Sequence, residues 1–219
     1  MKVLLFGATG MVGMGVLREC LLDPRLESVL TVGRLATKQS HTKLREITRK
    51  DLFNLEGLES ELMGYDACFF CLGMSSNDMD ADTYERFTYD LTVSVAQTLV
   101  RLNPGMTFTY VSGTGTDSSE KSISTWARVK GATENALLAL PFKAAYMFRP
   151  GIIRPLHGVK SKTKSYRFFY FVAAPFLPII AKLFPNSMTT TEQMGRAMIA
   201  VAAHGAPKKI LENVDINAL

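Results

Sequence analysis

Three glycines near the N-terminus have the spacing of a phosphate-binding loop. Gly7, Gly10 and Gly13 lie in the stretch LLFGATGMVGMGV, between a run that predicts a strand and a run that predicts a helix. Glycines let the backbone turn tightly and approach a pyrophosphate, while the N–H groups and dipole of the helix N-terminus favour its negative charge. The pattern predicts a dinucleotide-binding loop, with a turn that holds no ligand as the alternative.

The end of the second expected strand carries a cation where a cofactor is selected. Gly33 and Arg34 close the stretch SVLTVGR, about twenty residues after the glycine loop, and Lys38 lies close by. A site for NAD usually has an acidic residue here for the ribose 2′-OH, whereas an arginine accommodates the 2′-phosphate of NADP. Because no acidic residue ends this strand, the sequence favours NADP, with NAD as the second choice. A solvated Arg34 is the other interpretation.

Apolar runs alternate with helical patterns and predict the scaffold. Short buried strands separated by helices indicate a parallel sheet covered on both faces, which is an α/β doubly wound fold. With 219 residues, 47% of them hydrophobic, the chain suits a single domain over residues 1–219. The expected strands are residues 2–7, 28–34, 45–52, 66–73, 106–113 and 142–151, and the expected helices are residues 11–23, 84–102, 124–137 and 189–205.

On these motifs the chain resembles the short-chain dehydrogenase/reductase superfamily, in its atypical branch, nearly from end to end. It looks most similar to small bacterial NAD(P)-binding relatives of the Tat-interacting oxidoreductase-like and NAD-dependent epimerase-like proteins. The resemblance implies a Rossmann-type sheet. It assigns Asp51-Leu52 to the adenine, Cys71–Gly73 to the adenine ribose and Arg149–Gly151 to the nicotinamide. The positions expected at the cofactor are Gly7, Thr9, Gly10, Met11, Val12, Gly13, Arg34, Asp51, Leu52, Cys71, Leu72, Gly73, Lys130, Pro150, Gly151 and Ile152.

The resemblance also implies a Y-x-x-x-K pair, of which only the lysine is present. In the family the tyrosine transfers a proton, and the lysine holds the nicotinamide ribose and lowers the tyrosine's pKa. This sequence has Trp126 and Lys130 instead, and an indole N–H donates a hydrogen bond without ionising usefully. The catalytic residues that the resemblance implies are therefore Lys130 and Ser112, which stands where the family keeps a serine after the fifth strand.

The missing tyrosine leaves three functions open. Another residue supplies the proton, or the proton exchanges with water, or the protein binds the dinucleotide without turnover as a redox-sensing or scaffold protein. For Trp126 itself, packing on the core face of its helix is the plainer interpretation. The polar stretch VSGTGTDSSE follows a strand, where open α/β sheets bind ligands, unless it is only a solvated loop. It favours an oxidoreductase or epimerase-like enzyme acting on a carbonyl/alcohol substrate. The candidate proton donors are Ser112, Thr114, Asp117, Tyr84 and Tyr89.

Composition argues against several other classes. Twenty-five basic and 20 acidic residues give a net charge of +5 that is spread along the chain, which favours an anion site over a nucleic-acid surface. Cys68 and Cys71 spell C-x-x-C, but residues three apart on a strand point to opposite faces, so we expect no metal or disulfide there. His157 and His204 are lone histidines near turns, and we expect no catalytic role. The N-terminal apolar run is too short for a signal peptide, which predicts a cytoplasmic protein.

Residues 155–190 are expected to form a small apolar helical cover on the substrate side. Within them, residues 168–181 read FFYFVAAPFLPIIA, a run of fourteen residues without a charge that contains Pro175 and Pro178. A transmembrane helix needs about 20 residues and tolerates such interruptions poorly, so we expect no membrane span. A lid over a hydrophobic small molecule, a homodimer contact, a peripheral membrane anchor and plain core packing all stay open.

Overall fold

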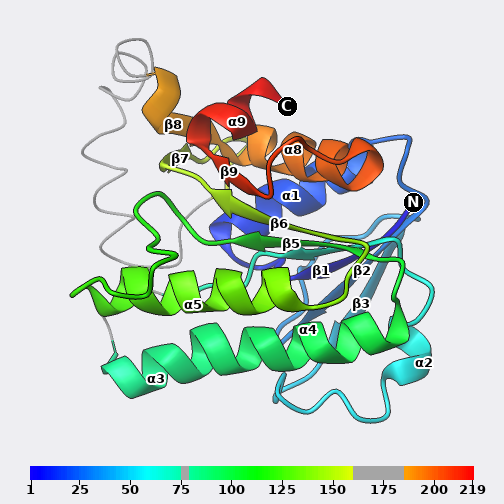
Figure 1. The fold of residues 1–219 in the computed structure, drawn as a ribbon. Helices are drawn as coiled ribbons and strands as arrows, with labels where there is room; N and C mark the ends of the chain where they lie inside the picture. Colours follow the sequence, from blue (N-terminus) through cyan, green and yellow to red (C-terminus); the bar gives the residue numbers. More distant parts are fainter. Residues whose placement is uncertain (75–78, 160–184) are drawn as a thin grey trace.

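A seven-stranded parallel sheet forms the centre of the computed structural model, which describes residues 1–74, 79–159 and 185–219 (Figure 1). Its strand order is β3-β2-β1-β4-β5-β6-β9, and each neighbouring pair is parallel. The order reverses between β1 and β4, and ligands of open α/β sheets bind at such a switch point. The strands are β1 (Lys2–Phe6), β2 (Ser28–Gly33), β3 (Leu44–Thr48), β4 (Ala67–Phe70), β5 (Thr107–Val111), β6 (Ala144–Arg149) and β9 (Ile210–Glu212).

Helices cover both faces of this sheet. In Figure 1, α3, α4 and α5 lie below the sheet, and α1, α8 and α9 lie above it. Between Gly151 and α8, two short parallel strands, β7 (Ile152–Arg154) and β8 (Met188–Thr190), pair with each other. The helices are α1 (Met11–Leu22), α2 (Glu59–Leu62), α3 (Ala81–Glu85), α4 (Leu91–Leu102), α5 (Thr125–Ala139), α8 (Thr191–His204) and α9 (Asn213–Ala218), with a π-helical turn at Arg86–Asp90 and a 3-10 turn at Pro185–Ser187.

The central strands are apolar on both sides because both sides are covered. Val3 and Leu5 of β1 pack in the cluster shared with α1 and α8, whereas Leu4 and Phe6 pack in the cluster shared with α4 and α5. Each of these four side chains is fully buried. This alternation follows from the two-residue period of a strand, and it confirms the predicted doubly wound sheet.

The two cysteines of the C-x-x-C stretch confirm the same geometry. Cys68 lies in β4 and packs in the α4/α5 cluster, whereas Cys71 packs against the α1/α8 cluster. Both are free thiols, and burial raises the pKa of each one. Their positions on opposite faces match the prediction made from strand periodicity.

The remaining differences concern short elements and helix ends. The helix expected at residues 84–102 begins earlier, at Ala81, where the Asp80 side chain accepts a hydrogen bond from the Thr83 N–H, and a π-helical turn interrupts it. Three-residue strands such as β9 were not predicted, because their stability comes from pairing with a neighbour and not from a local pattern. The expected cover cannot be compared, since residues 160–184, including the apolar run 168–181, lie outside the described residues. None of the described helices is long and apolar enough to cross a membrane.

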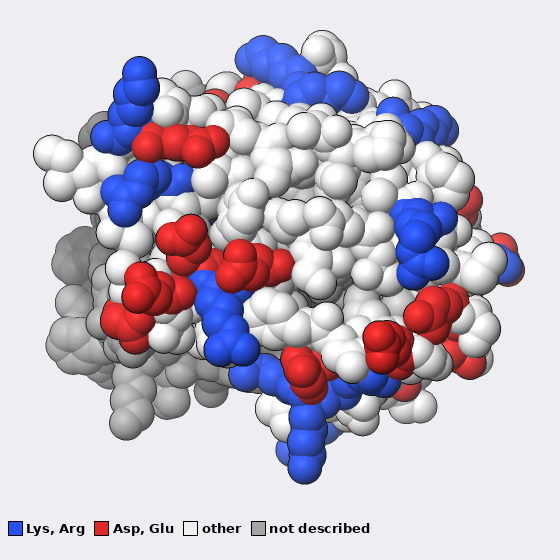
Figure 2. Space-filling view, turned by 60° about the horizontal axis from the view of Figure 1, so that its bottom comes forward, with Lys and Arg blue, Asp and Glu red and all other residues white. Residues whose placement is uncertain are grey.

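Charged side chains are mixed on the face that carries α3 and α4. Figure 2 shows basic and acidic groups interspersed around an uncharged central area of this face. A continuous basic stripe, the usual footprint of a nucleic-acid surface, is absent from the part of the surface visible there.

Candidate functional site

The glycine loop brings the backbones of β1, α1 and β4 closer than side chains would allow. Gly7 has a left-handed φ of +82°, and a Cβ on it would lie 2.6 Å from the backbone of Cys71 and Leu72. A Cβ on Gly13 would lie 2.1 Å from the Gly7 carbonyl oxygen. No side chain fits at either position, so the first turn of α1 sits directly against the loop.

The N-terminus of α1 is open to an anion. Its N-cap residue is Gly10, which has no side chain to accept from the first-turn N–H groups, and that turn contains no acidic residue. The first N–H groups of a helix lack intrahelical partners and carry its positive dipole end. The expected phosphate positions Met11 and Val12 therefore belong to an uncapped turn beside the loop.

A cavity of about 320 Å³ opens beside the glycine loop, at the carboxyl ends of β1 and β2. Five of the sixteen residues expected at the cofactor line this cavity, namely Gly7, Thr9, Arg34, Leu52 and Leu72. Five other lining residues were missed by sequence reasoning, which considered motif positions only. These are Ala8, Thr31, Val32, Gly33 and Leu35.

Two charged residues expected near this cavity differ in position. Arg34 lies on its wall, is exposed, and makes no ion pair or side-chain hydrogen bond within the described residues. Asp51 is also exposed, but its carboxylate accepts a hydrogen bond from the Phe53 N–H at 2.9 Å and so caps a turn. Its neighbour Leu52 contributes the apolar wall instead.

Glu46 organises the loop that carries Arg34, and sequence reasoning missed it. Its carboxylate accepts from the Thr37 N–H at 2.8 Å and lies 3.2 Å from the Thr31 hydroxyl. Thr31 and Glu46 are register partners on β2 and β3. One carboxylate therefore fastens both ends of the stretch that includes Arg34. A sequence cannot signal this contact, because it depends on the register of two strands.

Lys130 lies buried at the carboxyl end of β5. Its Nζ donates to the carbonyl oxygens of Ser112, at 2.5 Å, and Val111, at 3.4 Å. Burial lowers the pKa of Lys130 to about 8, an effect that the nearby Glu134 carboxylate partly opposes. The lysine thus holds the loop that follows β5.

The indole of Trp126 covers the same loop from outside. A Cβ on Gly113 would lie 3.3 Å from the indole ring, and one on Gly115 would lie 3.6 Å from it. The Lys130 Nζ is 5.9 Å from the centroids of both the Trp126 and Tyr110 rings, within range of a cation–π attraction. Trp126 therefore packs on the loop and on Lys130, with its side chain half-buried.

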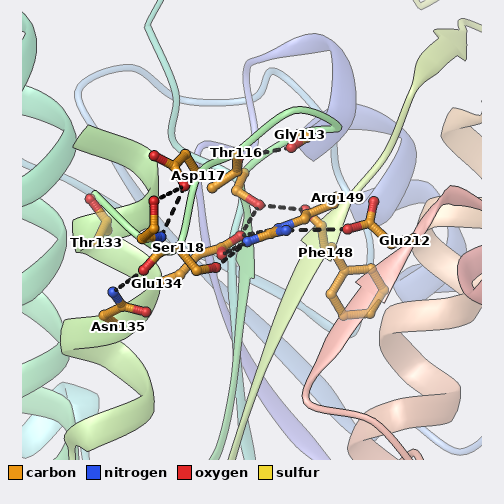
Figure 3. Close-up of polar contacts among 12 residues, drawn as sticks. Gly113, Thr116, Asp117, Ser118, Thr133, Glu134, Asn135, Phe148, Arg149 and Glu212 are labelled. Atoms are coloured by element: carbon orange, nitrogen blue, oxygen red, sulfur yellow. Dashed lines mark hydrogen bonds and ion pairs between the residues drawn. The ribbon is translucent and has the colours of Figure 1, made fainter. Parts of the chain in front are cut away.

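A buried carboxylate that the sequence did not reveal joins the ends of β5 and β6. Glu134, on α5, is fully buried and receives the Ser112 hydroxyl at 2.5 Å. It also accepts hydrogen bonds from the guanidinium of Arg149, from Nε at 3.0 Å and from Nη2 at 2.5 Å. Figure 3 shows Glu134 and Arg149 facing each other, with Glu212 on the other side of the guanidinium. Ser112 is thus hydrogen-bonded inside the protein.

The other candidate proton donors, which are Thr114, Asp117, Tyr84 and Tyr89, do not lie together in one site. The exposed Thr114 lies on the loop after β5, where its hydroxyl donates to the Arg149 carbonyl at 3.1 Å. Hydrogen bonds from the hydroxyl and N–H of Ser119 lower the pKa of Asp117 to about 2, so this group is a loop-organising carboxylate. Tyr84 is buried on α3, and Tyr89 lines a different hollow, on the outer side of α5.

The Arg149–Gly151 turn is fixed against the C-terminal segment. The Gly151 N–H donates to the Asn213 side chain at 2.9 Å, and a Cβ on Gly151 would lie 2.3 Å from the Ser187 carbonyl oxygen. The Thr114 N–H donates to the Pro150 carbonyl at 2.9 Å. The loop after β5 and the turn after β6 therefore form one connected wall, to which Ile152 belongs as the first residue of β7.

Removing the buried ammonium should change how stability depends on pH. The pKa of Lys130 is about 8 in the folded chain against an ordinary 10.5, so between these values the unfolded chain binds more protons and stability rises with pH. Lys130→Met should therefore gain stability relative to wild type below pH 8, by on the order of 2 kcal/mol, and this gain should shrink as pH rises towards 10.5. Urea unfolding at several pH values measures it. The exposed Lys121→Met serves as control, and a difference that does not vary with pH would contradict the prediction.

Comparison of the sequence with known proteins finds relatives at low identity. No protein-family model matches the chain. It is 26% identical to Protein HTATIP2 of Rattus norvegicus over 154 residues, which cover 69% of this chain and only 62% of that protein. It is 25% identical over 219 residues to Protein FMP52-2, mitochondrial, of Scheffersomyces stipitis, covering 96% of this chain and 90% of that one.

Solved structures share the fold at lower identity. A short chain dehydrogenase family protein from Francisella tularensis matches with a TM-score of 0.65 and 16% identity, over 93% of this chain and 91% of that one. The Bordetella bronchiseptica enzyme WbmF, solved in complex with NAD+, matches with a TM-score of 0.68 and 16% identity, over 99% of this chain and 76% of that one. These likenesses confirm the Rossmann-type sheet.

One expectation is corrected by these relatives. The short N-terminal apolar run predicted a cytoplasmic protein, whereas the four FMP52 relatives are all named as mitochondrial proteins. That prediction considered only a secretory signal peptide, whereas mitochondrial transit peptides have a different composition.

Proposed function

Because the chain resembles the atypical short-chain dehydrogenase/reductase superfamily of NAD(P)-binding Rossmann proteins, we propose that it binds NADP(H) and transfers a hydride to or from a carbonyl/alcohol substrate. The observation that carries this proposal is the cavity beside the glycine loop. The loop with Gly7 and Gly13 lies beside it, and its wall carries Arg34, a cation without an ion-pair partner within the described residues.

The glycine loop fits a pyrophosphate. A Cβ at Gly7 or Gly13 would collide with the backbone, so glycine at these positions lets the loop and the first turn of α1 pack together, as a pyrophosphate-binding loop requires. The uncapped first turn of α1 would donate N–H groups to the phosphates. The adenosine half would lie in the cavity, against Val32, Leu52 and Leu72.

Arg34 supports NADP as the preferred dinucleotide, although the solved relative WbmF holds NAD+. The guanidinium lies on the cavity wall without a protein partner within the described residues, and no acidic residue lines the cavity. A guanidinium binds a phosphate through two parallel hydrogen bonds and gains little from a ribose hydroxyl. The 2′-phosphate is therefore the group that Arg34 would recognise.

The nicotinamide half would lie along the wall built by the loop after β5 and the Arg149–Gly151 turn. Lys130 would hold the nicotinamide ribose with its ammonium group, and the backbone of Pro150, Gly151 and Ile152 would orient the ring. When bound, the dinucleotide supplies or accepts the hydride. Trp126 excludes water from one side of the loop but cannot exchange the proton. The Thr114 hydroxyl is exposed but donates its proton to the Arg149 carbonyl, so bulk water remains as the proton source for the substrate oxygen.

A second function is supported by a specific observation: Ser112 is hydrogen-bonded inside the protein, and Lys130 and Trp126 pack on each other. This arrangement suits a protein that binds the dinucleotide without turnover, as a redox-sensing or scaffold protein. Incubation of the protein with NADPH and a panel of apolar and polar aldehydes and ketones separates the two. Loss of the dihydronicotinamide absorbance with any of them identifies an oxidoreductase, and tight NADPH binding without loss across the panel favours the second function.

Arg34→Ala should weaken binding of NADPH by about 10–100-fold and leave binding of NADH nearly unchanged, because only NADPH carries the phosphate. Trp126 is the only tryptophan in the sequence, so its emission reports ligand binding next to the loop after β5. Titration of this emission with each dinucleotide gives both affinities. Lys38→Ala is the matched control, since Lys38 is an exposed cation on the same loop that does not line the cavity. Equal losses for NADPH and NADH in Arg34→Ala would rule out selection by this arginine.

A further inference from the structure

We propose that Glu134 is a positioning residue for the nicotinamide end of the site, which it shapes by fixing the Ser112 hydroxyl and the Arg149 guanidinium. This inference rests on the proposed function, since it concerns how the chain receives the nicotinamide half of the dinucleotide.

Glu134 uses both carboxylate oxygens. Oε1 lies 2.5 Å from the Ser112 Oγ and 3.0 Å from the Arg149 Nε, and Oε2 lies 2.5 Å from the Arg149 Nη2. The side chain is fully buried, so water does not compete for these bonds. The Ser112 hydroxyl has one proton, and both acceptors within its reach, Glu134 Oε1 and the Phe148 carbonyl at 3.1 Å, are protein groups, so it has none left to give to a substrate.

The carboxylate joins three separate elements at one edge of the sheet. Glu134 comes from α5, Ser112 follows β5, and Arg149 ends β6. Lys130 lies four residues before Glu134 on the same helix and donates to the Ser112 carbonyl. One serine is thus held twice from α5, at its hydroxyl by Glu134 and at its carbonyl by Lys130.

Arg149 connects Glu134 to the turn that would face the nicotinamide. Its remaining donors reach Glu212 at 3.2 Å and the Ser118 hydroxyl at 2.5 Å, and Figure 3 shows these partners around the guanidinium. The Arg149 carbonyl and the next one, of Pro150, accept from the Thr114 hydroxyl and N–H. A shift of the guanidinium would therefore move the wall formed by the turn and the loop after β5.

The loop residue Ser118 reaches Arg149 because α5 has a glycine, Gly131, where the loop packs against the helix. A Cβ on Gly131 would lie 1.8 Å from the Asp117 carbonyl oxygen, so the backbone at Asp117 and Ser118 rests directly on the helix. A buried ion pair is weak evidence for stability, since a well-packed apolar pair often serves as well. Five hydrogen bonds join α5, the loop after β5, the end of β6 and β9. These directional bonds fit a role of Glu134 in fixing the relative positions of these elements.

Glu134→Gln tests the proposal in the 219-residue chain. The amide keeps the volume and one acceptor, but it loses the charge and the two-oxygen grip on Arg149. We expect NADPH affinity to fall by about tenfold, whereas affinity for 2′,5′-ADP, which lacks the nicotinamide half, should stay within about twofold of wild type. Calorimetric titration of both ligands gives the two ratios.

Two further variants complete the experiment. Glu120→Gln is the matched control, because Glu120 also bonds to α5, at Asn135 and 2.7 Å, but from an exposed loop position; it should bind both ligands as wild type does. If Glu134→Gln does not fold, the double variant Glu134→Leu/Arg149→Met replaces the ion pair with apolar side chains and should show the same selective loss of NADPH affinity.

The outcomes separate this proposal from the one it rests on. Equal losses for NADPH and 2′,5′-ADP would reduce Glu134 to general structural support and overturn the proposal, as would unchanged affinities for both. Wild-type protein that binds neither ligand would overturn the proposed dinucleotide function itself, and the role of Glu134 with it.

Discussion

Replacing Gly13 with alanine should abolish dinucleotide binding, raising the Kd for NADPH by at least about 100-fold. The new Cβ would lie 2.1 Å from the Gly7 carbonyl oxygen and 2.7 Å from the Gly7 carbonyl carbon, closer than any real Cβ contact. Both neighbours are backbone atoms, so the loop and the first turn of α1 must move apart. That movement displaces the N–H groups proposed to hold the pyrophosphate and costs about 1–3 kcal/mol of stability.

Gly105→Ala is the control for the general cost of replacing a glycine. Gly105 lies in the turn between α4 and β5, and a Cβ there would meet no atom within 4 Å. This variant should bind NADPH as wild type does and unfold at nearly the same temperature. Wild-type NADPH affinity in folded Gly13→Ala would show that the dinucleotide binds away from this loop.

Arg149→Met should lower the free energy of unfolding by about 3–5 kcal/mol, because it leaves the buried Glu134 carboxylate without its cation. Glu134 has no exposed surface and would retain only the Ser112 hydroxyl. Equilibrium urea unfolding measures the loss. The double variant Glu134→Leu/Arg149→Met should recover most of it, since neither member of the ion pair then remains buried without the other.

The chain offers a matched surface pair as control for this experiment. Arg45 and Glu61 also lie 2.5 Å apart, but their side chains are 63% and 43% exposed. Water solvates both charges there, so Arg45→Met should cost about 0–1 kcal/mol. If Arg149→Met lowers the free energy of unfolding no more than Arg45→Met does, the guanidinium does not stabilise the buried carboxylate as described.

The sequence by itself determined the scaffold and the position of the glycine loop within it. The spacing of Gly7, Gly10 and Gly13 and the alternation of apolar strands with helices are local patterns, and a few neighbouring residues decide them. Arg34 could be placed for the same reason, because it directly follows a strand whose end must lie at the edge of the sheet. Short elements such as β9 escaped prediction, since a three-residue strand exists only through its pairing with β6.

Only the tertiary structure decided the contacts at the end proposed for the nicotinamide. Ser112, Glu134 and Arg149 come from three elements, and nothing in their spacing indicates contact. They meet because β5 and β6 are neighbours in the sheet and α5 presents one particular face to them. The resemblance selected Ser112 and Lys130, but it could not show that the Ser112 hydroxyl and the Lys130 ammonium are both bonded to protein groups. Such bonds depend on how a helix is rotated against the sheet, which is a property of the packed core and not of any local run of residues.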